Sequence, residues 1–303
     1  MRISPTLTQV VLNALNVSDQ AEQTALEQMT TGRRVNQASD DPAAAASEVN
    51  IAYRMDGCDQ YLRSISSLQS EMQTADSSLN SAVTALQNAI SLGVEGANGT
   101  LSQQDRATLA QQADGITQQI LGVANLSYNG HYLFAGTANA QPPYVADPSV
   151  PGGIAYQGND NVNSVEIETG QSMAANQPGS ALFSATGANV FQALSDLATA
   201  LRNPDGTTDE IGNATTELRT AYDQLDQARA FYGNTVDQLT SVQGFLNSEQ
   251  VQLSQQQNSA VGVDANVAAT NLTNAEQARN ATVQAAASLN GMSLMDYLST
   301  TTV

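Results

Sequence analysis

The residues of this chain that could do chemistry are few and far apart in the sequence. Asp40 and Asp41 are adjacent carboxylates, a pairing that general acid–base catalysis could use, but no histidine lies near them. An aspartate directly before a proline is the pattern of a helix N-cap with proline at the first helical position, so Asp41 and Pro42 are interpreted as a cap. His131, the single histidine, adjoins a turn and is expected at the surface.

Other candidate reactive groups also lack the neighbours that their chemistry requires. Cys58 is the only cysteine, which excludes an intrachain disulfide and a cysteine metal cluster. The chain has no lysine, so it has no P-loop lysine and no Schiff-base lysine. The segment 170–174 lacks the second glycine of a nucleophile elbow. Four acidic residues of the same region lack calcium-loop spacing, namely Asp147, Asp160, Glu166 and Glu168. We therefore predict no enzymatic activity, no cofactor and no metal site.

Charge and hydropathy exclude two further classes of partner. The formal net charge is −19, and the ten basic residues are scattered arginines, so no cationic patch is available for nucleic acid or for an anionic membrane. No run approaches 18 consecutive apolar residues, and the first 17 residues lack the pattern of a secretory signal. The sequence predicts a protein that is either cytosolic or exported without cleavage.

The elements that position these residues are long helices. In each half of the chain, apolar residues recur at alternating intervals of four and three residues, and we call each such line a seam. This 4-3 spacing predicts a mainly α fold. We expect a long antiparallel helical rod, a coiled-coil bundle formed by both chain halves, with a small central β-rich insert. The first seam is Tyr61, Ile65, Leu68, Met72, Ala75, Leu79, Ala82, Leu86 and Ala89; the second runs from Ile211 through Leu218, Leu225, Tyr232, Leu239 and Leu246 to Leu253.

Three domains are predicted from these patterns. Residues 1–42 and 261–303 form a terminal coiled-coil assembly domain, 43–127 and 189–260 a helical rod domain, and 128–188 an outward-facing β-rich insert. Gly32 ends the first terminal helix, and Ser102 with Asp105 has the spacing of a capping box. The insert is expected to be dispensable for folding of the helices, since loop length adds only slowly to closure entropy.

The two terminal segments carry a narrow, alanine-rich stripe that is too small to hold a lone hairpin. We expect both ends to be loosely folded until neighbouring molecules cover them. Arg279 and Thr282 interrupt the C-terminal stripe. The predicted assembly seam is Ile3, Leu7, Val10, Ala14 and Val17, facing Leu272, Ala275 and Leu289.

The joint after the first helix carries a family resemblance. Residues 29–44, Met-Thr-Thr-Gly-Arg-Arg-Val-Asn-Gln-Ala-Ser-Asp-Asp-Pro-Ala-Ala, resemble the flagellin-family signature. Residues 129–137, with Pro142-Pro143-Tyr144 and Tyr156-Gln157-Gly158-Asn159, are similar to one branch, the hook–filament junction proteins. Residues 289–298 resemble that branch too.

The resemblance implies a structural protein of the bacterial flagellum that forms a ring between the hook-side adaptor and the filament. It implies an extracellular location, reached unprocessed through flagellar type III export. The implied partners are further copies of the chain, a neighbouring hook-associated protein, flagellin and an export chaperone. The alternatives are a flagellin filament subunit and a coiled-coil adhesin or scaffold.

Overall fold

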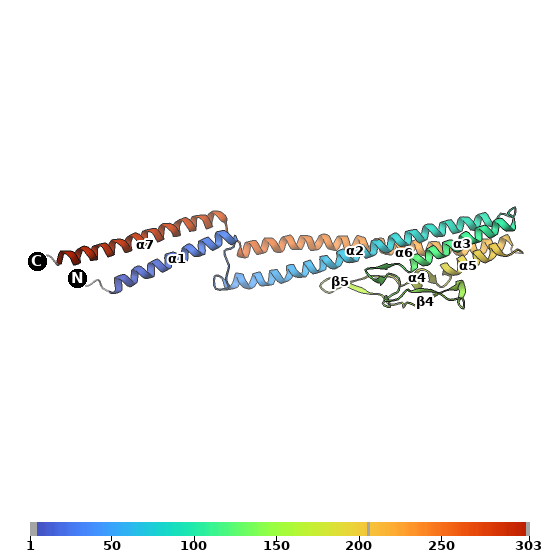
Figure 1. Ribbon diagram of the computed structural model, residues 1–303, viewed down its shortest axis with the longest axis horizontal. Coiled ribbons are helices and arrows are strands. Elements are labelled where there is room, and N and C mark those ends of the chain that lie inside the picture. Colours follow the sequence, from blue (N-terminus) through green and yellow to red (C-terminus); the bar gives the residue numbers. More distant parts are fainter. Residues whose placement is uncertain (1–4, 205–206, 301–303) are drawn as a thin grey trace. The chain divides into compact units, whose positions relative to one another are not determined.

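A computed structural model describes residues 5–204 and 207–300, with the side chains of residues 9–204 and 207–288 (Figure 1). The chain divides into two compact units, the first made of Met1–Gly57 with Ser248–Val303 and the second of Cys58–Asn247. The predicted mainly α fold is confirmed. The helices are α1 (Pro5–Thr31), α2 (Pro42–Gly96), α3 (Gln103–Ala124), α4 (Gly179–Leu182), α5 (Val190–Arg202), α6 (Thr208–Val261) and α7 (Ala265–Thr300), with a short 3-10 turn η1 (Pro151–Gly153).

The second unit has a core built on the two predicted heptad seams. Leu79 and Leu86 of α2, and Leu218 and Leu225 of α6, are fully buried. Polar pairs cross between the two helices at their edges: Gln69 donates to Thr240 (3.2 Å), and Gln87 to the hydroxyl of Tyr222 (3.0 Å). The strict 4-3 spacing thus identified the residues that pack α2 against α6.

Two shorter helices, α3 and α5, lie side by side in this unit (Figure 1). The predicted capping box at the start of α3 is confirmed, because the Ser102 side chain accepts from the Asp105 N–H while the Asp105 carboxylate accepts from the Ser102 N–H. Ile120 of α3 and Leu194 of α5 are fully buried. Burial of apolar side chains therefore holds this pair in place.

The central insert consists of short antiparallel ladders, as the turn-rich sequence indicated. Each ladder joins two neighbouring strands, and the pairs are β1–β2, β3–β4, β5–β6 and β7–β8. The strands are β1 (Ser127–Tyr128), β2 (His131–Tyr132), β3 (Tyr144–Ala146), β4 (Ile154–Tyr156), β5 (Ser164–Glu168), β6 (Gln171–Ala174), β7 (Ser184–Ala185) and β8 (Ala188–Asn189).

The insert packs on the helices through an aromatic cluster, an observation that argues against its predicted dispensability for folding of the helices. Phe191 of α5 is fully buried, with its ring centroid 5.2 Å from Tyr144 and 6.3 Å from Phe183, and Phe134 lies 5.5 Å from Phe183. Gly152, at φ +79°, approaches the same helix so closely that a Cβ there would lie 2.6 Å from the Gln192 nitrogen. Removing the insert would expose the ring of Phe191, which the insert covers.

The first unit contains α1, α7, the first turns of α2 and the last turns of α6. In Figure 1, α1 (blue) and α7 (red) lie side by side. At the α2–α6 pair of this unit, Arg54 and Glu249 form an ion pair of 2.6 Å. No helix of the described residues is long and apolar enough to cross a membrane.

Candidate assembly surface

The faces by which α1 and α7 meet are narrow and partly polar. On α1, Ser18 and Ala25 are buried, and Val11 and Leu15 are half-buried. The corresponding line on α7 consists of small or polar residues around one leucine: Ala268, Leu272, Ala275 and Thr282. Small side chains bury little apolar area, so this contact contributes little hydrophobic stabilisation.

Polar contacts cross between the helices at two places. The hydroxyls of Ser18 and Thr282 lie 3.5 Å apart. One turn along, the Nε of Arg279 lies 2.8 Å from Asp19 Oδ1 and 3.4 Å from Glu22 Oε2. Arg279 and Thr282, which interrupt the apolar stripe in the sequence, are therefore contact residues of the pair. Sequence reasoning missed them because it ranked positions by hydrophobicity alone.

The predicted seam residues do not all face each other. Leu272 is half-buried and Ala275 is buried, but Ala14 is exposed, and Val10 and Val17 are 63% and 66% exposed. The expectation that the N-terminal stripe faces α7 is therefore wrong for these three α1 residues. The physical reason is that a neighbouring line on the same helix, containing Ser18, faces α7 instead. Ile3 lies outside the described residues, as do the side chains of Leu7 and Leu289.

As a result, the α1–α7 pair carries large apolar side chains on its outer faces. Five of them are on α1 and two on α7, each roughly half or more exposed. These residues are Val10, Leu12, Val17, Leu26, Met29, Val267 and Val283. Exposed apolar side chains that lie together on a surface are typical of an interaction site. We call this set the outer apolar set.

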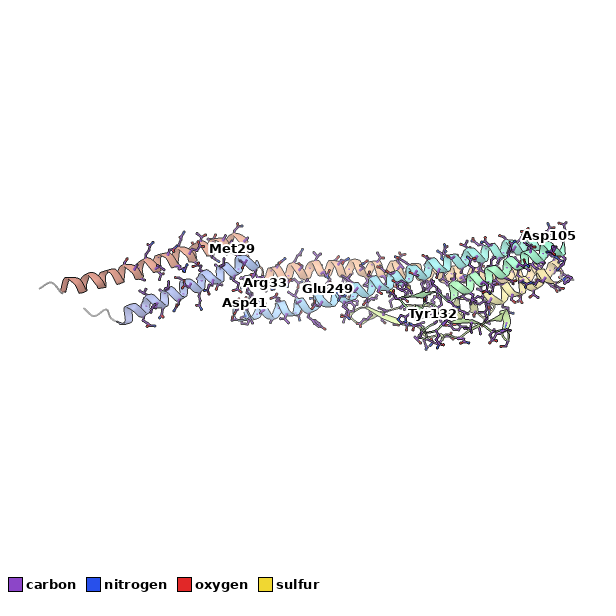
Figure 2. All side chains as sticks on the ribbon, viewed as in Figure 1. Met29, Arg33, Asp41, Asp105, Tyr132 and Glu249 are labelled. Atoms are coloured by element: carbon purple, nitrogen blue, oxygen red, sulfur yellow. The ribbon has the colours of Figure 1, made fainter. Side chains whose placement is uncertain are left out.

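The joint, residues 32–41 with residues 262–264, ties the two terminal helices together. Gly32 has φ +69°, a left-handed conformation that favours glycine, directly after α1 ends. The Arg34 N–H donates to the Val261 carbonyl (2.7 Å), and the Val263 N–H donates to the Gly32 carbonyl (3.1 Å). Figure 2 labels Met29, Arg33 and Asp41 in this region. The segment that resembles the flagellin signature thus holds the two chain segments by backbone hydrogen bonds.

Side chains reinforce the joint. Asp41 Oδ1 accepts from the Ala44 N–H (3.0 Å) at the start of α2, which begins at Pro42. Arg34 Nη2 donates both to Asp41 Oδ2 (3.1 Å) and to the Ala260 carbonyl (2.9 Å). The Ala44 N–H and the Arg34 guanidinium together hold the pKa of the Asp41 carboxyl below its usual 3.8. This arrangement is that of a helix cap.

The neighbouring carboxylate, that of Asp40, also accepts hydrogen bonds from the backbone. Asp40 Oδ2 accepts from the N–H groups of Asn36 (3.0 Å) and Gln37 (2.9 Å). Both members of the carboxylate pair are thus occupied by structural hydrogen bonds. Among the described residues, no group of three or more His, Cys, Asp or Glu side chains is arranged to hold a metal ion.

Both halves of the chain resemble known proteins. Residues 5–139 match the bacterial flagellin N-terminal helical region. The chain is 28% identical to flagellar hook-associated protein 3 of Escherichia coli K12, over 88% of this chain and 90% of that protein. It is 26% identical to polar flagellin B/D of Vibrio parahaemolyticus, over 78% of this chain and 62% of that protein. The fold is shared with the flagellar junction protein FlgL from Legionella pneumophila, with a TM-score of 0.60 at 14% identity, over 71% of this chain and 100% of that chain.

The fold and these matches define a flagellin-like chain that resembles proteins of the bacterial flagellum. The resemblance to the flagellin family that the joint sequence indicates is confirmed. Within that class, the similarity to hook-associated protein 3 extends over most of both chains, whereas the flagellin match covers 62% of that protein. The reported relatives are all flagellar proteins.

Proposed function

We propose that this chain forms the junction ring between the hook, through its adjacent adaptor, and the flagellar filament. The observation that carries the proposal is the outer apolar set on α1 and α7. The two helices meet through small and polar residues, while Val10 (63%) and Val17 (66%) are exposed. The pair therefore gains its main hydrophobic stabilisation only when neighbouring molecules cover these side chains. The terminal helices thus act as the assembly domain, and the predicted seam residues contribute to the contacts between subunits.

The proposal has finer features, which extend the expectations drawn from the sequence resemblance. The chain is exported unprocessed and works outside the cell, with further copies of itself, a neighbouring hook-associated protein and flagellin as partners. An exposed apolar surface is an aggregation liability in the cytoplasm, which supports a dedicated export chaperone that covers it before export.

The test is the double variant Val10→Asp with Val17→Asp, compared with Val94→Asp. All three valines are more than half exposed in helices, and Val94 lies in the second unit near the end of α2. The isolated double variant should keep the main melting transition of the wild type, because its new carboxylates stay in water. In cells it should be exported but leave hooks without filaments, since assembly would bury the charges. Val94→Asp should support filaments.

Normal filaments in cells with the double variant would overturn the assembly role of this surface. A flagellin filament subunit is the second candidate, since polar flagellin B/D aligns with 78% of the chain. Seeding the purified protein with filament fragments separates the two functions. A junction protein adds a short cap, whereas a flagellin extends the filament.

A further inference from the structure

Asparagine is followed directly by glycine at residues 98, 129 and 290 of the chain. In such a pair the glycine nitrogen can attack the side-chain amide carbon of the asparagine, because glycine has no Cβ to hinder the close approach. One pair, Asn98 with Gly99, lies in the turn between α2 and α3, where both residues are exposed. The local structure of this turn distinguishes it from the other two pairs.

The Asn98 side chain is folded back over the peptide that follows it. Its Oδ1 accepts from the Thr100 N–H (3.2 Å) and from the Thr100 hydroxyl (3.0 Å). The ring that the first bond closes, an Asx turn, contains both the Asn98 side-chain carbon and the Gly99 nitrogen. The Gly99 N–H makes no hydrogen bond among the described residues. The two groups that would react are therefore held near each other, and the attacking nitrogen is unoccupied.

The two donors of Thr100 also address the atom on which negative charge would develop. Attack on the amide carbon turns Asn98 Oδ1 into an oxyanion. Hydrogen-bond donors that are already aimed at such an oxygen stabilise the charge as it forms. Thr100 thus supplies a small oxyanion hole from its backbone and its side chain together.

The other two pairs lack this arrangement. Asn129 and Gly130 form the tight turn between β1 and β2, with φ of +49° and +83°. No hydrogen bond to the Asn129 side chain occurs among the described residues. Gly291 lies inside α7, where a backbone N–H is engaged in the helix.

We propose that Asn98 is a site of spontaneous modification, at which the asparagine is converted to aspartate and isoaspartate. Base removes the Gly99 amide proton, and the nitrogen forms a bond to the Asn98 side-chain carbon. The bond from that carbon to its own amide nitrogen breaks, and ammonia leaves. Water then opens the resulting succinimide ring at either carbonyl, which gives aspartate or, with the main chain running through the former side chain, isoaspartate.

Either product weakens the turn. Asn98 lies shortly after α2 ends at Gly96, and a new carboxylate there is close to the negative end of the helix dipole. The turn is closed by hydrogen bonds from the Asn98 N–H to the Glu95 carbonyl (3.0 Å) and from the Leu101 N–H to the Asn98 carbonyl (3.1 Å). Isoaspartate adds a methylene to the main chain between these bonds. Modified protein should therefore have a loosened start of α3.

The experiment follows the reaction in the purified full chain at mildly alkaline pH, by peptide mapping with mass spectrometry. Asn129 is the reference site in the same sample. Asn98 should react several-fold faster than Asn129 in the folded protein, and at a similar rate in denaturant, where the turn is lost. Gly99→Ala should slow the reaction at Asn98 only, and its Cβ would meet nothing within 4 Å.

Thr100→Val removes the hydroxyl donor and keeps the N–H donor. It should slow the reaction at Asn98 roughly 2- to 10-fold in the folded protein only, the effect of one neutral hydrogen bond. Thr100→Ser keeps the hydroxyl and should react at the wild-type rate, and circular dichroism checks that each variant folds. Asn129 reacting as fast as Asn98 in the folded chain, an unchanged rate in Thr100→Val, or an advantage of Asn98 that persists in denaturant would each overturn the site. None of these outcomes bears on the junction function.

Discussion

The Nε of Arg279 lies 2.8 Å from Asp19 Oδ1, which joins residues 260 positions apart in the chain. Together with the Ser18–Thr282 contact, this ion pair fixes the register of α1 against α7. An alanine-rich interface specifies its register weakly, because sliding it by one turn changes the buried area little. Polar contacts at defined positions are a recognised way to specify register.

Arg279→Ala should therefore loosen the α1–α7 pair specifically. The partners are 49% and 40% exposed, so the loss is small, about 0.2–1 kcal/mol, and it should shrink as salt is added. Hydrogen exchange of the α1 amides measures it. Arg219→Ala, which removes the same charge from an exposed position of α6, is the control and should leave α1 exchange unchanged.

Leu225→Ala should destabilise the second unit strongly. The side chain is fully buried in the α2–α6 seam, and truncation of such a residue costs about 2–5 kcal/mol. Denaturant unfolding followed by circular dichroism gives the difference in free energy of unfolding. Val94→Ala, at a position 56% exposed, should change it by under about 0.5 kcal/mol. Equal losses in the two variants would contradict the assignment of the seam as core.

Phe191→Ala should destabilise the second unit by about 3–5 kcal/mol, because its fully buried ring contacts both Tyr144 and Phe183. Phe245→Ala serves as the matched control, since that ring is 55% exposed. Near-ultraviolet circular dichroism should show loss of the aromatic environment in the first variant only. A Phe191→Ala protein as stable as the control would mean that the insert does not depend on α5.

Acid should loosen the start of α2. The folded pKa of Asp41 is lowered by the Ala44 N–H and by Arg34, so the cap contributes its stabilisation fully above the ordinary value of 3.8 and loses it as the pH falls through the lower folded value. The protection of the Ala44 amide against hydrogen exchange, relative to its intrinsic exchange rate at each pH, should fall down this range. Asp41→Asn keeps a cap that does not titrate and should remove that acid-dependent step. An identical acid response in Asp41→Asn would assign the effect to another carboxylate.

The long inner helices could be predicted from the sequence because Leu and Ile repeat there with strict 4-3 spacing, as at Leu79 and Leu218. The same criterion failed on α1, where Val10 and Val17 form an equally regular line that is exposed. Hydrophobicity cannot choose between adjacent faces of a helix when the true contact is made by Ser18, Ala25 and a charged pair.

The contact of the insert with α5 also could not be predicted from the pattern of apolar residues in the sequence. Its strands are two to five residues long, so alternation of apolar residues is too short to assign a buried face. A signal was nevertheless present in the composition. Three of the five phenylalanines, Phe134, Phe183 and Phe191, fall between residues 134 and 191, and such a concentration of aromatics indicates a local core.

The separation between Ser18 and Thr282 has a consequence for the order of folding. Ser18 and Thr282 are 264 residues apart, and closing a flexible loop of that length has an entropic cost of about 5 kcal/mol. This cost exceeds the stabilisation that a single surface ion pair and a single hydroxyl contact provide together. The α1–α7 pair therefore has high contact order and is expected to form after α2 has paired with α6 and brought Arg34 close to Val261. Because α1 is synthesised before α7, it stays without its partner until α7 has been made.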